Sequence, residues 1–283
     1  MLKKPEWLRI PYTENPNKHI VESILEKLNL NTVCAEASCP NYSDCFSQKT
    51  ATFMILGTNC TRNCSFCNVN HALPHPADEN EPDNISKAVA ELSLRYVVIT
   101  SVTRDDLPDG GAGHFAKVIR KIQTTSPETA IEVLIPDFGG CLDSLDIVTN
   151  SAPTVISHNM ETVASLYSSV RPDAEYRRSL NLLKNIKLKN ANIHSKSGIM
   201  LGLGEKKNEV LRLFDDLREV QCEFLTIGQY LAPSKNHFPV YEYVHPDKFK
   251  EYGEIALSKG FSAVASGPLV RSSYKAETLL KTV

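Results

Sequence analysis

Residues 52–68 read TFMILGTNCTRNCSFCN, an apolar run followed at once by a loop with three cysteines. The apolar part, Thr52–Leu56, has the length and composition of a buried β-strand. Five further apolar runs follow, with helical patterns between them: Tyr96–Thr100, Ile131–Ile135, Thr154–Ser157, Gly198–Leu201 and Phe224–Ile227. Near-continuous apolar strands that alternate with helices are typical of a parallel sheet covered by helices.

Six strand–helix units are too few for a closed eight-stranded barrel, so the sequence predicts an α/β fold built as a partial (β/α)6 TIM-like barrel. Ligands of such folds gather at the carboxyl ends of the strands, and the cysteine-rich loop begins at one of those ends. We expect an amino-terminal extension at residues 1–49, the partial barrel at 50–262 and a carboxyl-terminal extension at 263–283.

The composition is ordinary for a globular protein, with 283 residues, 42% hydrophobic, 23% charged and a formal net charge of −2. A charge so close to zero gives no reason to expect nucleic acid or a membrane surface as a partner. No apolar run approaches the roughly 20 residues that span a bilayer, and the first ten residues carry no signal-like segment. We therefore expect a cytoplasmic protein whose thiols stay reduced.

Six of the eight cysteines fall within 34 consecutive residues, which indicates metal binding rather than disulfides in a reducing compartment. The triad Cys60-x3-Cys64-x2-Cys67 can hold three irons of a four-iron cluster and leave the fourth iron open. A zinc site of four thiolates would need another cysteine, usually in a second close pair, and this loop has none. We favour the cluster and keep zinc as the alternative.

The other clustered cysteines, Cys34-x4-Cys39-x5-Cys45, indicate a second metal centre in the amino-terminal extension. Their spacing alone also allows a zinc knuckle that staples the extension. Cys141 and Cys222 stand apart, and we expect both in the hydrophobic core, because free cysteine packs as a small apolar residue.

Taken together, the motifs resemble the lipoyl synthase family of the radical S-adenosylmethionine superfamily. The resemblance runs from about Leu30 to Ala276, nearly the whole chain. It includes both cysteine triads and five further motifs: TSVTRDDLPDGG at 100–111, HNMET at 158–162, KSGIMLGLGE at 196–205, GQYLAPS at 228–234 and RSSY at 271–274.

Lipoyl synthases insert two sulfur atoms, at the sixth and eighth carbons, into an octanoyl chain carried on a lysine of a carrier protein. The resemblance implies two [4Fe-4S] clusters and S-adenosylmethionine, which is cleaved to a 5′-deoxyadenosyl radical. The expected ligands of the radical-generating cluster are Cys60, Cys64 and Cys67. The expected ligands of the auxiliary cluster, the sulfur donor, are Cys34, Cys39, Cys45 and Ser273, although Ser272 and Ser273 would otherwise be taken for a polar turn.

Four residues are expected to contact S-adenosylmethionine. Asn159 and Glu161 follow the fourth predicted strand, where they could instead begin a helix as cap and first-turn acid. Gly202 and Gly204 follow the fifth strand and allow close approach of a ligand, although glycines there are often structural. Asp105 and Asp106 receive no role.

The resemblance also implies partners. These are octanoylated lipoyl carrier domains (the acyltransferase subunits of 2-oxoacid dehydrogenases and the glycine cleavage H protein), a low-potential electron donor such as ferredoxin or flavodoxin, and an iron–sulfur carrier that reloads the auxiliary cluster. A basic stretch could receive an acidic carrier, or could be a solvated helix face. It consists of Arg177, Arg178, Lys184, Lys187, Lys189 and Lys196.

One position departs from the family pattern: Asn68 follows the last cysteine where aspartate is expected, and the linker Asn70–Pro82 also matches poorly. Two alternatives stay open. One is another radical sulfur-inserting enzyme, resembling biotin synthase or a methylthiotransferase, which the RSSY motif disfavours. The other is an iron–sulfur carrier or electron-transfer protein, which would need neither six strand–helix units nor an open iron.

Overall fold

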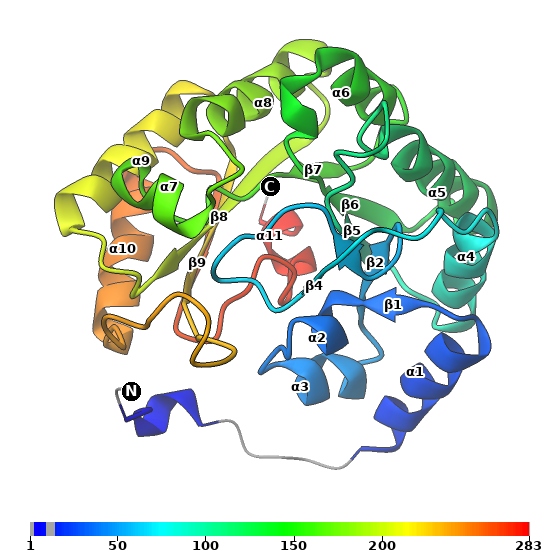
Figure 1. Cartoon of the computed structure of the whole chain (residues 1–283), viewed down its shortest axis with the longest axis horizontal. Coiled ribbons are helices and arrows are strands. Elements are labelled where there is room, and N and C mark those ends of the chain that lie inside the picture. The colour runs from blue at the N-terminus through cyan, green and yellow to red at the C-terminus, as the bar shows by residue number, and fades with distance from the viewer. Residues whose placement is uncertain (1–2, 10–14, 283) are drawn as a thin grey trace. The chain divides into compact units, whose positions relative to one another are not determined.

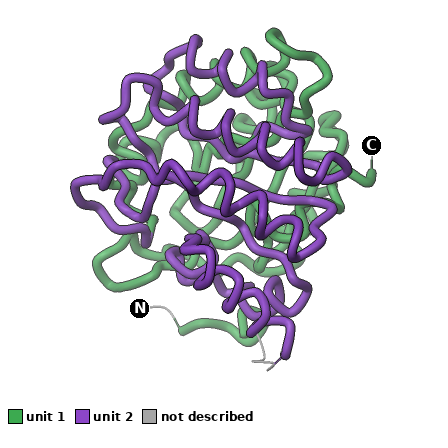
Figure 2. Tube along the Cα trace, turned by 90° about the vertical axis from the view of Figure 1, so that its right-hand side faces the viewer, with its two compact units in different colours: residues 1–10, 63–67, 157–283 green, residues 11–62, 68–156 purple. Residues whose placement is uncertain are grey.

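The computed structural model describes residues 3–9 and 15–282, and it divides the chain into two compact units (Figure 2). Unit 1 consists of Met1–Ile10, Asn63–Cys67 and Ser157–Val283, and unit 2 consists of Pro11–Arg62 and Asn68–Ile156. The chain thus passes from unit 2 to unit 1 and back within the cysteine-rich loop. Within the described residues, no helix combines the length and the apolar character that a membrane crossing requires.

Unit 2 contains strands in the sheet order β1-β2-β5-β6 and a small separate pair, β3-β4. Its strands are β1 (Asn31–Thr32), β2 (Thr52–Ile55), β3 (Asn59–Cys60), β4 (Asn70–His71), β5 (Tyr96–Ser101) and β6 (Ala130–Leu134). Its helices are α1 (Pro16–Lys27), α2 (Val33–Glu36), α3 (Tyr42–Ser47), α4 (Glu81–Glu91), α5 (Ala112–Thr125), η2 (Phe138–Gly140) and α6 (Leu142–Thr149). β1 is antiparallel to β2, and the pairings β2-β5 and β5-β6 are parallel.

Helices α4, α5 and α6 lie on one side of the strands of unit 2 (Figure 1). Their apolar residues recur at helical spacing, as Phe115, Ile119 and Ile122 do on α5, and all three are buried. Fully burying one such side chain stabilises the fold by roughly 1.5–3 kcal/mol.

Unit 1 contains strands in the order β8-β9-β10, all parallel. Its elements are η1 (Glu6–Leu8), η3 (Ala164–Leu166), α7 (Tyr167–Val170), α8 (Tyr176–Lys189), β8 (His194–Leu201), α9 (Lys207–Glu219), β9 (Phe224–Gln229), α10 (Pro246–Ser258), β10 (Ala263–Ser266) and α11 (Glu277–Leu280). β7 (Val155–Ser157) runs from unit 2 into unit 1. Helices α8, α9 and α10 lie on one side of β8 and β9, and the carboxyl-terminal segment with α11 lies on the other (Figure 1).

All six predicted strands are present, as β2, β5, β6, β7, β8 and β9. The sheet also continues into both expected extensions, since β1 pairs with β2 and β10 pairs with β9. β10 forms because α10 ends before Gly260, and the chain then returns along β9 from Ala263. A run of four residues with small side chains carried too weak a signal to predict it.

The expectation for the two isolated cysteines is half right. Cys222 is buried as predicted, but Cys141 is exposed. Cys141 immediately precedes α6, and a hydrogen bond involving Ser144 lowers the pKa of its thiol. A helix amino terminus on the surface thus replaces the core environment that we expected.

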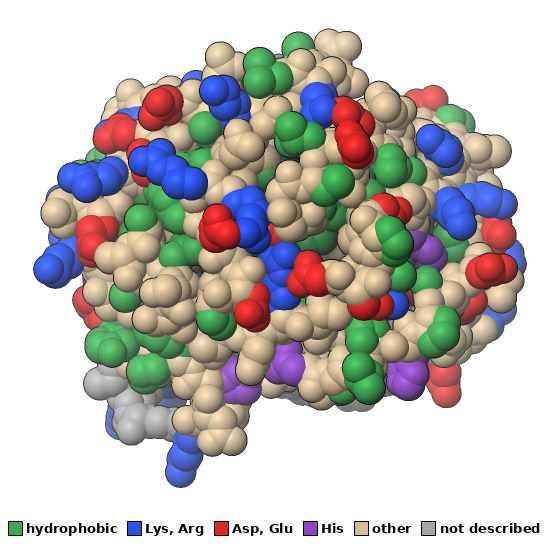
Figure 3. All heavy atoms as spheres, turned by 45° about the horizontal axis from the view of Figure 1, so that its top comes forward, with side chains coloured by type: hydrophobic (Ala, Val, Ile, Leu, Met, Phe, Trp, Pro, Cys, Tyr) green, Lys and Arg blue, Asp and Glu red, His purple; other side chains and the backbone are tan. Residues whose placement is uncertain are grey.

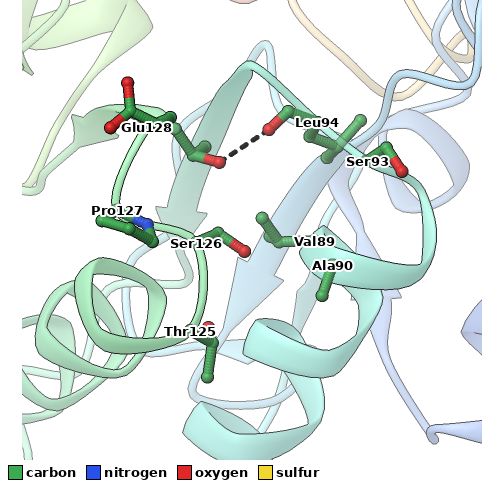
Figure 4. Close-up of a pocket in the computed structure, with 9 residues that line it drawn as sticks. Val89, Ala90, Ser93, Leu94, Thr125, Ser126, Pro127 and Glu128 are labelled. Atoms are coloured by element: carbon green, nitrogen blue, oxygen red, sulfur yellow. Dashed lines mark hydrogen bonds between the residues drawn. The ribbon is translucent and has the colours of Figure 1, made fainter.

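A pocket of about 380 Å³ lies in unit 2 (Figure 4). It is lined by the last turns of α4 and α5 and by the residues that lead into β5 and β6, and Thr129 Oγ1 donates to the Leu94 carbonyl there at 2.6 Å. These are the amino-terminal ends of the strands, whereas parallel folds bind ligands at the carboxyl ends. The pocket is therefore not a candidate site.

A strained turn leads from β2 into the cysteine-rich loop. Leu56 has a φ of 68°, which is rare for a branched residue. Its N–H donates to Glu81 Oε2 at 2.9 Å, and its carbonyl accepts from Arg104 Nη1 at 3.2 Å. His114 Nε2 lies 2.7 Å from the same Glu81 oxygen. Buried polar partners thus hold the backbone where the loop begins.

We expect Gly111→Ala to destabilise unit 2 strongly, because Gly111 has a φ of +91° and an added Cβ would lie 2.3 Å from Leu56 Cδ1. The left-handed strain and the clash together should lower the free energy of unfolding by about 3 kcal/mol. Gly139→Ala is the matched control, since Gly139 has a φ of +61° with open space around it, and should cost about 1 kcal/mol. Urea unfolding of the metal-free protein measures both, and equal losses would contradict the contact with Leu56.

Candidate iron–sulfur cluster and cofactor sites

The auxiliary triad lies within unit 2 on three short adjacent pieces of chain. Cys34 is on α2, Cys39 is in the turn that follows, and Cys45 is on α3. The Cys39 N–H donates to the Cys34 carbonyl at 3.1 Å, which closes the turn between them. Thr32 Oγ1 accepts the Ala35 N–H at 3.3 Å and caps α2.

The three thiols are close enough to repel one another when charged. Burial, and then the charge of Cys39, raises the pKa of the Cys34 thiol to about 11. Burial raises the pKa of the Cys45 thiol to about 12, with further contributions from Cys34 and Cys39. Bound iron would reverse this effect, because a coordinating thiol is deprotonated. Three adjacent thiols therefore fit the ligand set of an iron–sulfur cluster.

No three His, Cys, Asp or Glu side chains in the described residues converge on a point where one metal ion could sit. A single ion such as zinc needs its four ligands at about 2.0–2.3 Å. A four-iron cluster instead takes its thiolates on different irons, so its cysteines need not converge.

Cys60, the first residue of the radical triad, belongs to unit 2, where the loop after β5 holds it. The Thr103 N–H donates to Cys60 Sγ at 3.3 Å, and the Thr61 N–H donates to the Thr103 carbonyl at 3.0 Å. This main-chain contact fixes the position of the Cys60 sulfur within unit 2.

Arg62, in the same loop, joins two carboxylates. Its guanidinium donates to Asp105 in a bidentate pair, at 2.7 and 2.8 Å, and also lies 2.7 Å from Asp137. Burial alone would lower the pKa of Arg62, but the bonds to Asp105 and Asp137 outweigh it and raise that pKa. The sequence analysis gave Asp105 no role. The signal it missed was Arg62 itself, an arginine inside the cysteine motif, which needs an acidic partner when it is buried.

Cys64 and Cys67 belong to unit 1, in the segment Asn63–Cys67. The Ser65 N–H donates to the Val170 carbonyl at 3.0 Å, and Phe66 packs on the apolar cluster of Val170, Leu203 and Tyr230. His237 Nε2 lies 3.1 Å from the Cys67 carbonyl. This half of the loop is thus held by the main chain and by apolar packing.

Asn68 is tied to the auxiliary triad's segment within unit 2. Its Nδ2 donates to the Glu36 carbonyl at 2.8 Å and lies 3.4 Å from Ser38 Oγ. An ionised aspartate could not donate to a carbonyl, so the asparagine at this position has a local reason.

Asn159 and Glu161 lie side by side in unit 1, after β7. Asn159 Nδ2 donates to Glu161 Oε1 at 2.9 Å. Glu161 has a left-handed φ of 64° and forms an isolated parallel bridge with Ile199 of β8. Burial raises the pKa of its carboxyl against the opposing effects of Arg171 and Asn159. Asn159 and Glu161 thus neither begin nor cap a helix. A strained backbone beside a buried acid is typical of functional sites.

The two glycines expected to contact the cofactor already have close protein neighbours. An added Cβ on Gly202 would lie 2.3 Å from both Gln229 Nε2 and the Glu242 carbonyl, and the Gly202 N–H donates to Glu205 at 2.7 Å. Gly204 faces the ring of Tyr241. Close packing against β9 and the chain around Tyr241 and Glu242 thus accounts for both glycines, and a contact with the cofactor stays a prediction.

The two serines of the RSSY motif have different environments. Ser272 Oγ donates to Asn159 Oδ1 at 2.8 Å. Ser273 is half-buried, and its hydroxyl has no hydrogen-bond partner among the described residues. Ser273 is thus the serine whose oxygen is available to a ligand, while the hydroxyl of Ser272 is bonded to Asn159.

The expected basic face needs a correction. Lys196 is 1% exposed and donates to the Ser272 carbonyl at 2.7 Å, so it cannot belong to a docking surface. It lies inside β8, a strand whose side chains are nearly all buried. Lys187 is paired with Glu223 at 2.9 Å. Where the surface is visible in Figure 3, Lys and Arg side chains lie among Asp and Glu side chains.

Comparison with known proteins decides the family. The chain is 56% identical to a lipoyl synthase of Alkaliphilus metalliredigens (strain QYMF) over 279 residues, which covers 99% of this chain and 96% of that protein. It is 54% identical to a lipoyl synthase of Hahella chejuensis (strain KCTC 2396), over 97% of this chain and 83% of that one. This chain belongs to the lipoyl synthase family. The family model "Radical SAM superfamily" also matches residues 54–217.

Solved structures agree on the fold. Methylornithine synthase (PylB) has a TM-score of 0.55 at 13% identity, over 93% of this chain and 86% of that one. Streptococcus suis SuiB bound to a precursor peptide has a TM-score of 0.58 at 12% identity, over 90% of this chain and 57% of that one. The expected fold class, a partial α/β barrel, is confirmed, and so is the expected enzyme class, a radical S-adenosylmethionine sulfurtransferase of the lipoyl synthase family. The alternatives of a biotin synthase-like enzyme and an electron carrier are set aside.

We expect Asp137→Ala to destabilise this family member by about 3 kcal/mol, because it removes a fully buried partner from the buried Arg62 charge. Asp83→Ala is the control: Asp83 pairs with Lys121 at 2.6 Å, both are about half exposed, and the loss should stay below about 1 kcal/mol. Urea unfolding without metal measures both variants. Equal, small losses would show that the Arg62 pair does not hold the loop.

Proposed function

We propose that this enzyme converts an octanoyl chain, bound to a lysine of a carrier protein, into a lipoyl group by inserting sulfur at the sixth and eighth carbons. The observation that supports this most is the 56% identity to a lipoyl synthase over 99% of the chain. The adjacent thiols of the auxiliary triad support it further, since an additional cluster is what supplies sulfur in this proposal.

We infer that Cys60, Cys64 and Cys67 hold the radical-generating [4Fe-4S] cluster. When bound, this cluster supplies the electron that cleaves S-adenosylmethionine. The protein holds the loop at both ends, through Arg62 with its carboxylates and through Ser65 with the Val170 carbonyl.

Asn159 and Glu161 are proposed to bind the polar groups of S-adenosylmethionine. A carboxylate and an amide offer the acceptors and donors that a ribose or an amino-acid group requires. Their mutual hydrogen bond and the strained φ of Glu161 hold them in place before the ligand arrives. Gly202 and Gly204 are proposed to contact S-adenosylmethionine through backbone atoms alone.

The auxiliary cluster is proposed to bind Cys34, Cys39, Cys45 and Ser273 and to act as the sulfur substrate that is consumed. An alkoxide or hydroxyl oxygen is a harder ligand than a thiolate and suits iron–sulfur clusters less well. Such a ligand would be displaced more readily than a thiolate, as a cluster that gives up its sulfur would require. The hydroxyl of Ser273 is half-buried and has no partner in the part of the chain that the structure describes, which supports this assignment.

The proposed partners follow from this chemistry: an octanoylated lipoyl domain, a ferredoxin or flavodoxin as reductant, and an iron–sulfur carrier that restores the auxiliary cluster. Docking of an acidic carrier is proposed on α8, where Arg177 and Lys184 lie two turns apart and both are exposed. A cytoplasmic location is part of the same proposal.

We expect two clusters with separable functions. Alanine at Cys60, Cys64 and Cys67 should remove about half the iron and abolish formation of 5′-deoxyadenosine. Alanine at Cys34, Cys39 and Cys45 should also remove about half the iron but leave 5′-deoxyadenosine formation and abolish sulfur insertion. Anaerobic reconstitution, iron analysis and mass spectrometry of an octanoyl-lysine peptide measure all of this.

The wild-type enzyme should add two sulfurs to that peptide with loss of two hydrogens, and free octanoate should not react. A wild-type enzyme that cleaves S-adenosylmethionine but never adds sulfur to the peptide would refute the proposed function. Full iron in either triple variant would refute the two-cluster assignment.

We expect Ser273→Ala to lower sulfur insertion by about 100-fold, because the auxiliary cluster loses a ligand, while 5′-deoxyadenosine formation continues. Ser272 cannot serve as a neutral control, since its hydroxyl bonds to Asn159. Thr278→Ala can, because Thr278 is exposed in the same segment and, among the described residues, its hydroxyl bonds only to the Lys275 carbonyl. Lipoyl product at the native rate from Ser273→Ala would remove this residue from the ligand set.

A further inference from the structure

One face of unit 1 carries an unusual layer of polar groups. Side chains alternate along a strand, so Lys196 and Gly198 of β8 point to the same side. Thr226 of β9 lies beside Gly198 in the parallel register. This is the side on which Figure 1 shows the carboxyl-terminal segment, opposite α8, α9 and α10.

Gly198 leaves room for two side chains to meet above it. A Cβ at this position would lie 2.8 Å from Asn159 Oδ1 and 2.8 Å from Ser272 Oγ. The same two oxygens are joined by the hydrogen bond that Ser272 donates to Asn159. The absence of a side chain at Gly198 therefore permits a contact between residues more than 100 positions apart in the sequence.

The hydrogen bonds continue on both sides of this contact. Asn159 uses its other amide atom, Nδ2, to donate to Glu161, so its orientation is set by one acceptor and one donor bond. The Ser272 carbonyl accepts from Lys196 Nζ at 2.7 Å. Ser272 is thus held by its side chain and by its main chain.

The segment before Ser272 is fixed as well. Gln229 N–H donates to the Pro268 carbonyl at 3.3 Å. The Val270 carbonyl passes so close to Gly228 that an added Cβ would lie 2.1 Å from its oxygen. Residues 268–272 therefore lie directly on β8 and β9.

We propose that Ser272 is a positioning residue that couples the S-adenosylmethionine contacts, Asn159 and Glu161, to the auxiliary-cluster ligand Ser273. This inference rests on the proposed function, because it takes both residue roles from it. Ser272 and Ser273 are adjacent, so a shift of the Asn159 amide moves the main chain that carries the Ser273 oxygen. Such coupling is reciprocal: cofactor binding orders the Ser273 turn, and an ordered turn favours cofactor binding.

The first experiment uses the metal-free protein, so that it does not depend on cluster assembly. Hydrogen–deuterium exchange of the amides in 268–274 is compared among the wild type, Ser272→Ala and Lys196→Met. Both variants should exchange about fivefold faster there, the size expected when one net hydrogen bond is lost. Ser258→Ala is the control, because the hydroxyl of this exposed serine of α10 bonds, within the residues that the structure describes, only to the Ile255 carbonyl.

Gly198→Ala provides a second route, since its new methyl group would push Asn159 and Ser272 apart without replacing either. The same methyl group would also lie 2.6 Å from Thr226 Oγ1, whose hydroxyl must turn away. Gly198→Ala should raise exchange in 268–274 as Ser272→Ala does. The single variant Ser272→Thr, which keeps the hydroxyl, should exchange at the wild-type rate. If Ser272→Ala does not fold, the Gly198→Ala result decides. Unchanged exchange in whichever of these two variants folds would overturn the proposal.

The second experiment distinguishes coupling from a purely structural role. S-adenosylmethionine added to the reconstituted wild type and to Ser258→Ala should slow exchange in 268–274, and this slowing should be absent in Ser272→Ala. The 5′-deoxyadenosine formed per sulfur inserted should rise about fivefold in Ser272→Ala, for the same lost bond. If S-adenosylmethionine slows exchange in Ser272→Ala as much as in the wild type, and the ratio of 5′-deoxyadenosine to inserted sulfur is also equal, Ser272 only anchors the segment. A wild type that inserts no sulfur but shows the exchange differences would refute the proposed function, while the link between Ser272 and Asn159 stands.

Discussion

The buried guanidinium of Arg62 is the interaction on which the rest of unit 2 depends near the cysteine loop. It joins the chain after β2 to Asp105 after β5 and to Asp137 after β6, at distances of 2.7–2.8 Å. A buried arginine is stable only when its charge and its donors are matched, so the three loops must keep their relative positions. Cys60, two residues before Arg62, is held by this constraint.

Unit 1 uses a different device, a polar layer made possible by missing side chains. Gly198 and Gly228 let Ser272 and Val270 approach the strands where any larger residue would collide. The contacts that result bring the RSSY motif against the HNMET motif, and Lys196 Nζ donates to the Ser272 carbonyl. Three motifs that lie far apart in the sequence thus form one hydrogen-bonded group.

Backbone strain marks both places. Leu56 at the start of the cysteine loop and Glu161 beside Asn159 have positive φ values of 68° and 64°. Each is held by partners that over-determine it: Glu81 and Arg104 at Leu56, and β8 at Glu161. Strain of about 1–3 kcal/mol per residue persists only under such constraint, and it prepares a site before its ligand binds.

The sequence by itself determined the strands, the triads and the family, because these depend on local patterns. Thr52–Leu56 is apolar enough to be a strand in any parallel fold, and three cysteines within eight residues indicate a cluster without reference to the rest of the chain. Only the tertiary structure decided the environments of individual side chains. Lys196 reads as a surface charge but is buried, Cys141 reads as a core residue but is exposed, and Asp105 reads as a loop carboxylate but pairs with Arg62. Each outcome depends on a partner distant in sequence or on which face of an element a residue occupies, and no local pattern contains that information.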